Sequence, residues 1–282
     1  MKVSVIISVC DNRFEMFGRS LDTWVNQTEL KNEFELIIVD DSERNDLFNL
    51  CKEYNKINGL QFQLIRINNS KCDLPITTFT PVLTNNVGMR AARGDVVCIT
   101  GPETLQAENN IKFASSFSNR QECGYGLVYK SNKSFVNLIS KQWDGKFKGL
   151  LDLPGARADC LTKPPHPPAY YYFVAVKKKY VEKIGGLDER FAQGFCGEDD
   201  DFANRMRMSG ITPVFEHNII GIHQDHSSLN TEKHNMRFNR QDLKQRNLQL
   251  IKENLNNYNY IANRNHNWGD EKVIVYKEIL GG

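Results

Sequence analysis

Short apolar runs of strand length alternate with apolar residues at helical spacing through the first part of the chain. Residues 3–9 and 34–39 are rich in β-branched side chains and are followed directly by polar turn residues, as buried strands are. Apolar side chains recur at helical spacing in residues 14–24 and 47–57, and a further apolar run covers residues 95–100. Strands that alternate with helices pack as a largely parallel sheet with helices on its faces. We therefore expect an α/β fold with a mostly parallel central sheet.

Polar residues cluster where the predicted strands end. Ser8, Asp11 and Arg13 come at the end of the first run, and Asp40 and Asp41 follow the second. Ligands of open α/β sheets bind at the carboxyl ends of the strands, so we expect these side chains to line a ligand site. Two alternatives stay open: the aspartates only cap the next turn, and Arg13 is an exposed surface residue.

The overall composition excludes several classes of protein. A formal net charge of +2 in 282 residues is too small to indicate binding to nucleic acid. Seven cysteines without a Cys-x-x-Cys pair argue against a zinc knuckle or a disulfide framework, and they favour a reducing, cytoplasmic compartment. No window approaches the roughly 20 apolar residues that span a bilayer, and the opening lacks the features of a signal peptide. Peripheral association with a membrane stays open.

The middle and the end of the chain carry weaker patterns. Residues 131–169 contain the run KPPHPP and are expected to form a long irregular loop with a functional role. A strand at 170–176 and an acidic helix at 198–209 follow. Residues 233–256 have a polar helical pattern, and residues 272–279 are expected to form an edge strand or a contact to another subunit. A monomer and a homo-oligomer both stay open.

Four segments carry more specific information. They are VSVIISVCDNR at the start, ELIIVDDS at 35–42, NVG with ARGD within 86–95, and VEKIGGLDERFAQGFCGEDDDFANRMRMSGI at 181–211. In this order they resemble the GT-A glycosyltransferases, and most of all the large inverting family-two type. The resemblance implies a GT-A catalytic domain at 1–226, with a nucleotide-binding half (1–105) and an acceptor-binding half (106–226). Residues 227–282 would then be a C-terminal helical extension with an edge strand.

The resemblance also implies two substrates. One is a nucleotide-sugar donor, with UDP as the expected nucleotide. The other is a carbohydrate or glycan acceptor, as in polysaccharide biosynthesis. Asp40 and Asp41 would meet the nucleoside, because a carboxylate at a strand end can accept the imide hydrogen of uracil. The residues expected to bind the donor are Ser8, Asp11, Arg13, Asp40, Asp41, Asn86, Arg90 and Asp95.

The acidic run Glu198-Asp199-Asp200-Asp201 matches the acidic helix of the family, and the resemblance places the general base on Asp199. Transfer needs such a base to take the proton of the acceptor hydroxyl. Glu198 would hold the acceptor or the base, and Asp200 is a further candidate on the acceptor side. Close carboxylates repel one another, which raises the proton affinity of at least one of them. The alternative is that these residues only favour the start of a helix, although four carboxylates exceed what capping requires.

The sequence departs from the family at the metal site. Where an Asp-x-Asp motif is expected after residues 95–99 the chain reads TGPE, so one carboxylate, Glu103, remains. A single carboxylate is a poor site for Mg²⁺ or Mn²⁺ unless diphosphate oxygens and another side chain complete the shell. The resemblance implies that His223 or His226 is the second ligand, since related GT-A enzymes bring a late histidine to the metal, and an imidazole ligand would favour Mn²⁺. The alternative is that both histidines are structural or solvated.

On the acceptor side, Trp143 in a polar loop is the candidate for stacking on a sugar, whereas the tyrosines at 170–172 are expected to pack in the core. We therefore expect a glycosyltransferase of the hexosyltransferase type that acts with inversion. A retaining transferase on the same fold and a catalytically decayed protein that binds nucleotide-sugar or glycan stay open. A nucleotidyltransferase is disfavoured, because CDNRFEMFGR is not the Gly-rich basic loop that would hold a triphosphate.

Overall fold

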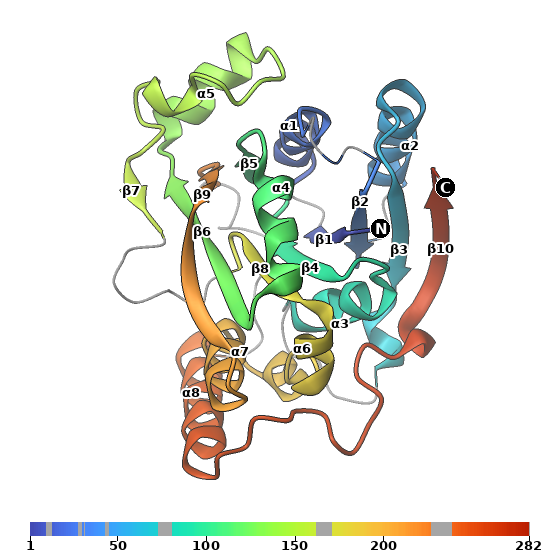
Figure 1. Cartoon of the computed structure of the whole chain (residues 1–282), viewed down its shortest axis with the longest axis vertical. Helices are drawn as coiled ribbons and strands as arrows, with labels where there is room; N and C mark the ends of the chain where they lie inside the picture. The colour runs from blue at the N-terminus through green and yellow to red at the C-terminus, as the bar shows by residue number, and fades with distance from the viewer. Residues whose placement is uncertain are drawn as a thin grey trace.

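A single mixed sheet runs through the molecule, with helices on both of its faces (Figure 1). The structure is a computed structural model, and it describes residues 1–9, 13–27, 30, 32–42, 45–72, 81–161, 171–226 and 239–281. Across these residues the strand order is β10-β3-β2-β1-β4-β8-β6-β9-β5, and β7 pairs with β6. The strands are β1 (Val3–Val9), β2 (Phe34–Asp40), β3 (Phe62–Ile67), β4 (Val96–Thr100), β5 (Thr104–Gln106), β6 (Glu122–Lys130), β7 (Asp159–Cys160), β8 (Val174–Lys177), β9 (Thr212–His223) and β10 (Ile274–Leu280).

Helices connect most of these strands. The α-helices are α1 (Phe14–Val25), α2 (Asp46–Asn58), α3 (Pro81–Ala91), α4 (Asn110–Ser115), α5 (Lys133–Gln142), α6 (Lys178–Lys183), α7 (Glu198–Met208) and α8 (Arg240–Asn256). The short 3-10 helices are η2 (Asn69–Lys71), η3 (Ser116–Asn119), η4 (Leu150–Asp152), η5 (Glu189–Gln193) and η6 (Glu271–Val273).

Strands β3, β2, β1 and β4 form the parallel centre of the sheet. The apolar runs of β1 and β4 are buried on both faces, as parallel strands covered by helices require. Antiparallel strands flank this centre: β10 lies beside β3 at one edge, and β8 follows β4. The expected α/β fold with a parallel central sheet is thereby confirmed, and β10 is the expected edge strand.

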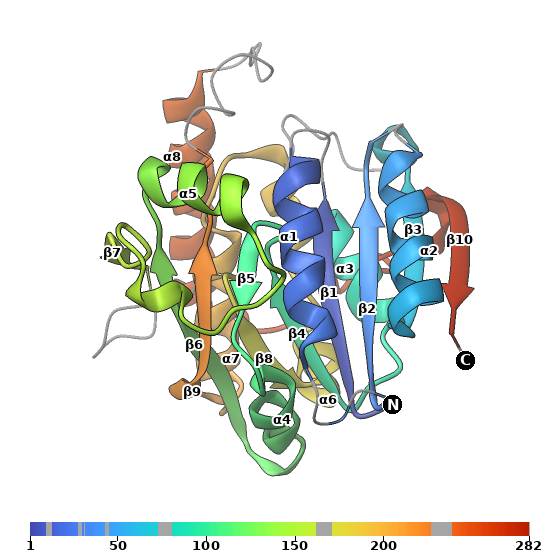
Figure 2. The same cartoon turned by 90° about the horizontal axis from the view of Figure 1, so that it is seen from above.

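Two hydrophobic clusters fill the layers on either side of the sheet. On one face, Phe17 and Trp24 of α1 belong to a cluster that also includes apolar residues of α2 and α4. On the other face, Val82 and Val87 of α3 belong to a cluster shared with α6 and α7. Figure 2 shows α1 and α2 in front of β1 and β2, with α3 behind them. The two layers exist because successive side chains of a strand point to opposite faces.

Residues 131–161 are more regular than expected. They contain α5, whose first turn is capped by Asn132, which accepts a hydrogen bond from the N–H of Phe135 (3.0 Å). Phe135 and Ile139 pack with Phe147 and Leu150 in a third, smaller cluster. The expectation of an irregular loop was wrong here: Phe135 and Ile139, four residues apart, form the apolar face of a short helix that this cluster buries. The KPPHPP run lies outside the described residues.

The C-terminal part of the chain lies close against the acidic helix. Helix α8 runs beside α7 and η5, and the chain then returns along the molecule to β10 (Figure 1). On this return, Asn263, His266 and Gly269 bond to the segment 185–189. The helical extension expected after the core is therefore present as α8, and the segment that follows it is tied to the core.

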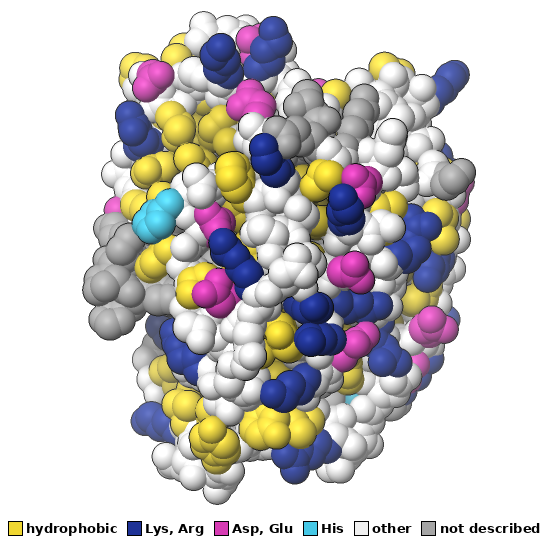
Figure 3. All heavy atoms as spheres, in the orientation of Figure 1, with side chains coloured by type: hydrophobic (Ala, Val, Ile, Leu, Met, Phe, Trp, Pro, Cys, Tyr) yellow, Lys and Arg dark blue, Asp and Glu magenta, His cyan; other side chains and the backbone are white. Residues whose placement is uncertain are grey.

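The surface carries charges of both signs. On the face shown in Figure 3, Lys and Arg side chains are interspersed with Asp and Glu, and apolar side chains gather at the upper left and toward the lower end. Leu255 and Tyr258, at the end of α8, are 43% and 63% exposed. None of the helices in the described ranges combines the length and the apolar character needed to cross a membrane.

Candidate active site

A pocket of about 270 Å³ opens at the carboxyl ends of β1 and β4. Ser8 of β1 and Arg13 before α1 line one part of it, Glu103 follows β4, and Asp199 comes from the first turn of α7. These four residues were predicted from distant parts of the sequence, and the structure brings them to one pocket. The remaining lining residues are Pro81, Asn85, Ile99, Thr100, Gly101, Pro102, Tyr171 and Tyr172.

Glu103 is the centre of a charged cluster in this pocket. Its Oε2 lies 2.6 Å from Nη1 of Arg13, and its Oε1 lies 3.0 Å from Nε2 of His223. Nε2 of His226 is 3.9 Å from the same Oε1. The pairing of β5 with β9, which sets Thr104 opposite His223, brings the histidine to this carboxylate.

The charges in this cluster perturb one another. Burial acts to raise the pKa of Glu103, but Arg13 and the two histidines outweigh it and hold that pKa well below its ordinary value. Burial, together with the nearby Arg13, lowers the pKa of His226 to about 4. Glu103 is therefore ionised and His226 neutral at neutral pH, which is the protonation state that a metal ion requires of such ligands.

Glu103, His223 and His226 fit a divalent cation. One ligand atom from each lies within 4.8 Å of the others. The 3.0 Å between Nε2 of His223 and Oε1 of Glu103 is close to the separation of two ligands at right angles that each lie about 2.1 Å from an ion. Within the described residues, the buried Nδ1 of His223 has no hydrogen-bond partner. Because Arg13 already adds a positive charge here, the set suits a cation that arrives with an anionic ligand.

Gln224, which sequence reasoning missed, fixes the backbone of this cluster. It is completely buried, and both its backbone N–H (3.1 Å) and its Nε2 (3.0 Å) donate to the carbonyl oxygen of Glu103. Nε of Arg19 in turn donates to Oε1 of Gln224 at 2.7 Å. A glutamine between two histidines gives no signal in the sequence, because its role depends on the strand pairing.

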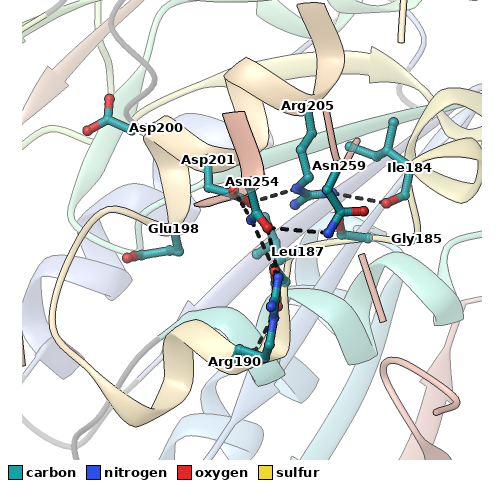
Figure 4. A network of polar contacts seen from close by, with 12 residues as sticks. Ile184, Gly185, Leu187, Arg190, Glu198, Asp200, Asp201, Arg205, Asn254 and Asn259 are labelled. Carbon is teal, nitrogen blue, oxygen red and sulfur yellow. Dashed lines mark hydrogen bonds and ion pairs between the residues drawn. The ribbon is translucent and has the colours of Figure 1, made fainter. Parts of the chain in front are cut away.

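The four carboxylates of α7 differ in their burial and fall into three groups. Asp201 is 1% exposed, and its Oδ2 is 2.6 Å from Nε of Arg205, which is itself fully buried. Asp200 is exposed and does not line the pocket. Figure 4 shows Asp201 inside a polar network, with Asp200 and Glu198 projecting away from it. Only Glu198 and Asp199 are partly buried, and Asp199 lines the pocket.

The pKa values of Glu198 and Asp199 are both raised. For Asp199 the causes are burial and the neighbouring Asp200, and its pKa rises to about 6. For Glu198 they are burial and Asp199, and its pKa rises to about 7. The hydroxyl of Tyr171 donates to the carbonyl oxygen of Glu198 at 3.0 Å and so ties the first turn of α7 to the pocket wall. The pair can therefore exchange a proton near neutral pH.

The aspartates at the end of β2 have partners of their own. Oδ2 of Asp40 accepts from Nε (3.1 Å) and Nη2 (3.0 Å) of Arg66, and its Oδ1 accepts from the N–H of Ser42 (2.9 Å). Burial raises the pKa of Asp40 despite these partners. Asp40 does not line the pocket, although β2 lies directly beside β1 in the parallel sheet. Asp11 lies outside the described residues.

Besides Asp40 and Asp41, three more of the expected donor-binding residues do not line the pocket. Asn86 is completely buried, and its carboxamide bonds the backbone of Leu187 and the carboxylate of Glu189. Arg90 lies over the ring of Trp268. Asp95 precedes β4 and so sits at the amino end of the strand whose other end leads to Glu103.

The neighbouring residue Asn85 lines the pocket instead of Asn86, and its Oδ1 accepts from the hydroxyl of Ser8 at 3.3 Å. The expectation missed by one residue because consecutive positions on a helix point about 100° apart, and the sequence does not show which of two asparagines faces the ligand. The hydroxyl of Ser8 also bonds to Thr84 of the same helix.

The aromatic residues of the pocket differ from the one that was expected there. The indole N–H of Trp143 donates to Oδ2 of Asp22 at 2.6 Å, and its ring packs against the third cluster, so Trp143 does not line the pocket. Tyr171 and Tyr172 do line it, and each also packs against a core cluster, as expected. They were expected in a strand, but β8 begins only at Val174, which leaves both tyrosines in the turn before it.

No protein-family profile matches the chain. A relative from Bacillus subtilis (strain 168), the uncharacterized glycosyltransferase YfnE, is 24% identical over an alignment of 272 residues that covers 81% of this chain. The chain spans 66% of the length of YfnE, slightly less than two thirds. The sequence is thus similar to that of a glycosyltransferase over most of its length.

Solved structures of glycosyltransferases share the fold. GalNAc-T7 with UDP, GalNAc and Mn²⁺ has a TM-score of 0.63 at 15% identity, covering 91% of this chain and 49% of that one. TarS of S. aureus with UDP has a TM-score of 0.56 at 15% identity, with coverages of 91% and 72%. The mannosyltransferase PcManGT of Pyrobaculum calidifontis with GDP-Man and Mn²⁺ has a TM-score of 0.52 at 16% identity, with coverages of 78% and 56%. The chain has the GT-A fold, as expected from its four sequence segments.

Proposed function

We propose that this chain is a glycosyltransferase that moves a hexose-type sugar from a nucleoside-diphosphate donor to a carbohydrate acceptor, with inversion at the anomeric carbon. The observation that carries the proposal is that Glu103 and Asp199, which come from distant parts of the chain, line the same pocket. The similarity to glycosyltransferases whose structures contain UDP or GDP-Man supports the class of donor. UDP is the expected nucleotide.

In this proposal Asp199 is the general base. Its carboxylate takes the proton of the acceptor hydroxyl while the hydroxyl oxygen bonds to the anomeric carbon. The bond from that carbon to the donor phosphate breaks, and its electron pair leaves with the nucleoside diphosphate. The raised pKa of Asp199, about 6, suits this role because a base is most effective when its pKa lies near the working pH. Glu198, the adjacent carboxylate, would orient the acceptor or share the proton.

Negative charge develops on the leaving diphosphate, and the Glu103 cluster faces the pocket where this would happen. The guanidinium of Arg13, 2.6 Å from Glu103, can turn its remaining donors to phosphate oxygens. Glu103, His223 and His226 would hold a divalent cation, with Mn²⁺ expected, and that ion when bound would stabilise the leaving group. Ser8 and Asn85 would contact the donor from β1 and α3. Asp40 and Asp41, at the end of the neighbouring β2, remain proposed contacts to the nucleoside.

The two halves of the chain have different tasks in this proposal. Residues 1–105 supply Ser8, Arg13 and Glu103 to the donor side, and residues 106–226 supply Tyr171 and Asp199 to the acceptor side. The two adjacent aromatic rings in the pocket wall, Tyr171 and Tyr172, would pack against sugar faces, since tyrosine offers apolar area with a polar end.

Donor hydrolysis tests the proposal without knowledge of the acceptor. The purified protein is incubated with a panel of UDP- and GDP-sugars, with Mn²⁺ or with a chelator, and release of nucleoside diphosphate is measured. We expect release from one or a few donors in the presence of Mn²⁺, and a loss of at least about 100-fold in Asp199→Asn. Asp242→Asn, an exposed aspartate on α8, is the matched control and should retain full activity.

The possible results separate the hypotheses. Binding of a nucleotide-sugar without turnover in any metal, even with glycan acceptors supplied, would favour a catalytically decayed binding protein. Turnover that survives in Asp199→Asn would remove Asp199 as the base. With an acceptor in hand, the anomeric configuration of the product distinguishes inversion from retention.

A further inference from the structure

The inner face of α8 combines leucine with asparagine. The residues of α8 that are buried against the core are Leu243, Asn247, Leu250 and Asn254, with exposures of 8%, 1%, 8% and 3%. Their spacing of four, three and four residues places them on one side of the helix. Burying two carboxamides is unfavourable unless their donors and acceptors are satisfied, so the partners of these asparagines show what the helix holds.

Asn247 holds the loop that leads into the acidic helix. Its Nδ2 donates to the carbonyl oxygen of Cys196 at 2.8 Å and to that of Phe191 at 3.2 Å. Cys196 and Gly197, which directly precede α7, both have left-handed backbone conformations, with φ of 59° and 89°. Because Cys196 is not a glycine, this conformation is unfavourable and depends on surrounding contacts to persist. Asn247 supplies such a contact at the residue where the chain turns toward Glu198 and Asp199.

Asn254 holds the first turn of the same helix from another side. Its Nδ2 donates to Oδ1 of Asp201 at 2.7 Å, and its Oδ1 accepts from Nη2 of Arg190 at 2.9 Å (Figure 4). The other oxygen of Asp201 is paired with Arg205, whose Nη1 donates to the carbonyl oxygens of Ile184 (3.0 Å) and Gly186 (2.9 Å). The network in Figure 4 therefore joins α8, α7 and the Gly185–Gly186 turn into one unit.

We infer that Asn247 and Asn254 are positioning residues, which act from outside the core to fix the direction in which Asp199 points into the pocket. Asn247 fixes the backbone before Glu198, and Asn254 fixes the side chain of Asp201, so the helix turn that carries Glu198, Asp199 and Asp200 is held at both ends. The inference rests on the proposed function, because it assigns the purpose of this rigidity to the base. It also gives α8, which does not line the pocket, a supporting role for the active site.

The activity test compares Asn247→Ala and Asn254→Ala with Asn256→Ala, which removes an exposed asparagine from the same helix. We expect kcat for donor turnover to fall at least about tenfold in the first two variants, since small displacements of a catalytic group are costly. Affinity for UDP, or for GDP if the wild type uses a GDP-sugar, should change less than about twofold, because the donor-side residues lie on β1 and α3. The apparent pKa of the kcat profile should also shift, which a merely structural role would not cause.

A second measurement does not depend on activity. Hydrogen exchange of the amides at 195–200 should accelerate at least about tenfold in Asn247→Ala and stay unchanged in Asn256→Ala. If the wild type turns over no donor, the proposed function fails while the exchange experiment still reports on positioning. Unchanged exchange, or kcat within twofold of the wild type, would overturn the inference. If Asn247→Ala does not fold, Asn247→Gln, which displaces the same carboxamide by one methylene, takes its place with the same expected results.

Discussion

Replacing Asp199 by asparagine should stabilise the protein at neutral pH and leave its stability unchanged at pH 4. Burial and the nearby Asp200 raise the pKa of Asp199 to about 6 in the folded protein, whereas an aspartate in an unfolded chain titrates near 3.9. Between these values the folded state binds more protons than the unfolded state. The free energy of unfolding therefore falls as the pH rises from about 4 through about 6. Asparagine carries no charge and avoids this loss.

The size of the effect follows from the same values. The pKa of Asp199 rises from 3.8 to about 6, a difference of about two pKa units. One pKa unit corresponds to about 1.36 kcal/mol, so the difference corresponds to about 3 kcal/mol. Asp199 keeps some contact with solvent, and it shares its titration with Glu198. Both facts reduce the penalty, so we expect Asp199→Asn to gain about 1–2 kcal/mol at pH 7.5.

Urea denaturation of the wild type, Asp199→Asn and Asp242→Asn at pH 7.5 and pH 4.0 measures this difference. Asp242 is exposed on α8, and its replacement should change the free energy of unfolding by less than about 0.5 kcal/mol at both pH values. The opposite result is informative, because Oδ1 of Asp199 accepts from the N–H of Asp200 at 2.9 Å. If Asp199→Asn destabilises the protein at pH 7.5, the carboxylate of Asp199 stabilises the first turn of α7 by more than its burial costs. That result would refute the reasoning from burial.

Two further substitutions test how the polar residues divide between fold and pocket. Asp201→Asn should cost about 3–5 kcal/mol, since the fully buried Arg205 loses its counter-charge, and should lower Tm by about 6–10 °C; a loss below about 1 kcal/mol in urea denaturation would contradict this. Asn86→Ala should cost about 1–3 kcal/mol and leave UDP affinity unchanged, because Asn86 bonds only within the core. Asn85→Ala should weaken UDP binding several-fold and leave Tm unchanged, as measured by titration calorimetry and thermal melts. If instead Asn86→Ala weakens UDP binding and Asn85→Ala lowers Tm, Asn86 binds the donor and Asn85 supports the fold.

The elements that could be predicted from the sequence are those that carry a complete local pattern. Strand β1 and helix α1 can be predicted from their apolar patterns, because the periodic apolar residues of each element are the ones that it buries. Helix α5 also carries apolar residues at helical spacing, but its pattern lasts only about two turns within a segment that was expected to be irregular. The sequence shows the carboxylates of α7 as a group, but it does not show which of them face the pocket. Asp201 is internal because its partner Arg205, one turn later, lies against the Gly185–Gly186 turn.

Long-range pairing limits what local patterns can reveal about the site. His223 meets Glu103 only because β9 pairs with β5, and no spacing between the two residues encodes that register. The resemblance to known transferases supplied the pairing, and the structure places the three side chains together. The same resemblance could not decide between Asn85 and Asn86, or between Trp143 and the tyrosines, because those choices depend on helix phase and on where β8 begins.

The charges of the pocket explain how a transferase could work with one carboxylate where an Asp-x-Asp motif would supply two. Arg13 pairs with Glu103, so the carboxylate is not an isolated buried charge. A divalent cation alone would add charge beside the Arg13 guanidinium and would be repelled. A diphosphate brings enough negative charge to neutralise both, which reverses that repulsion and draws the cation in with the donor. A second carboxylate would remove this dependence, because it would hold a cation in the empty pocket. In the proposed function, the single glutamate would therefore couple cation binding to the presence of the substrate.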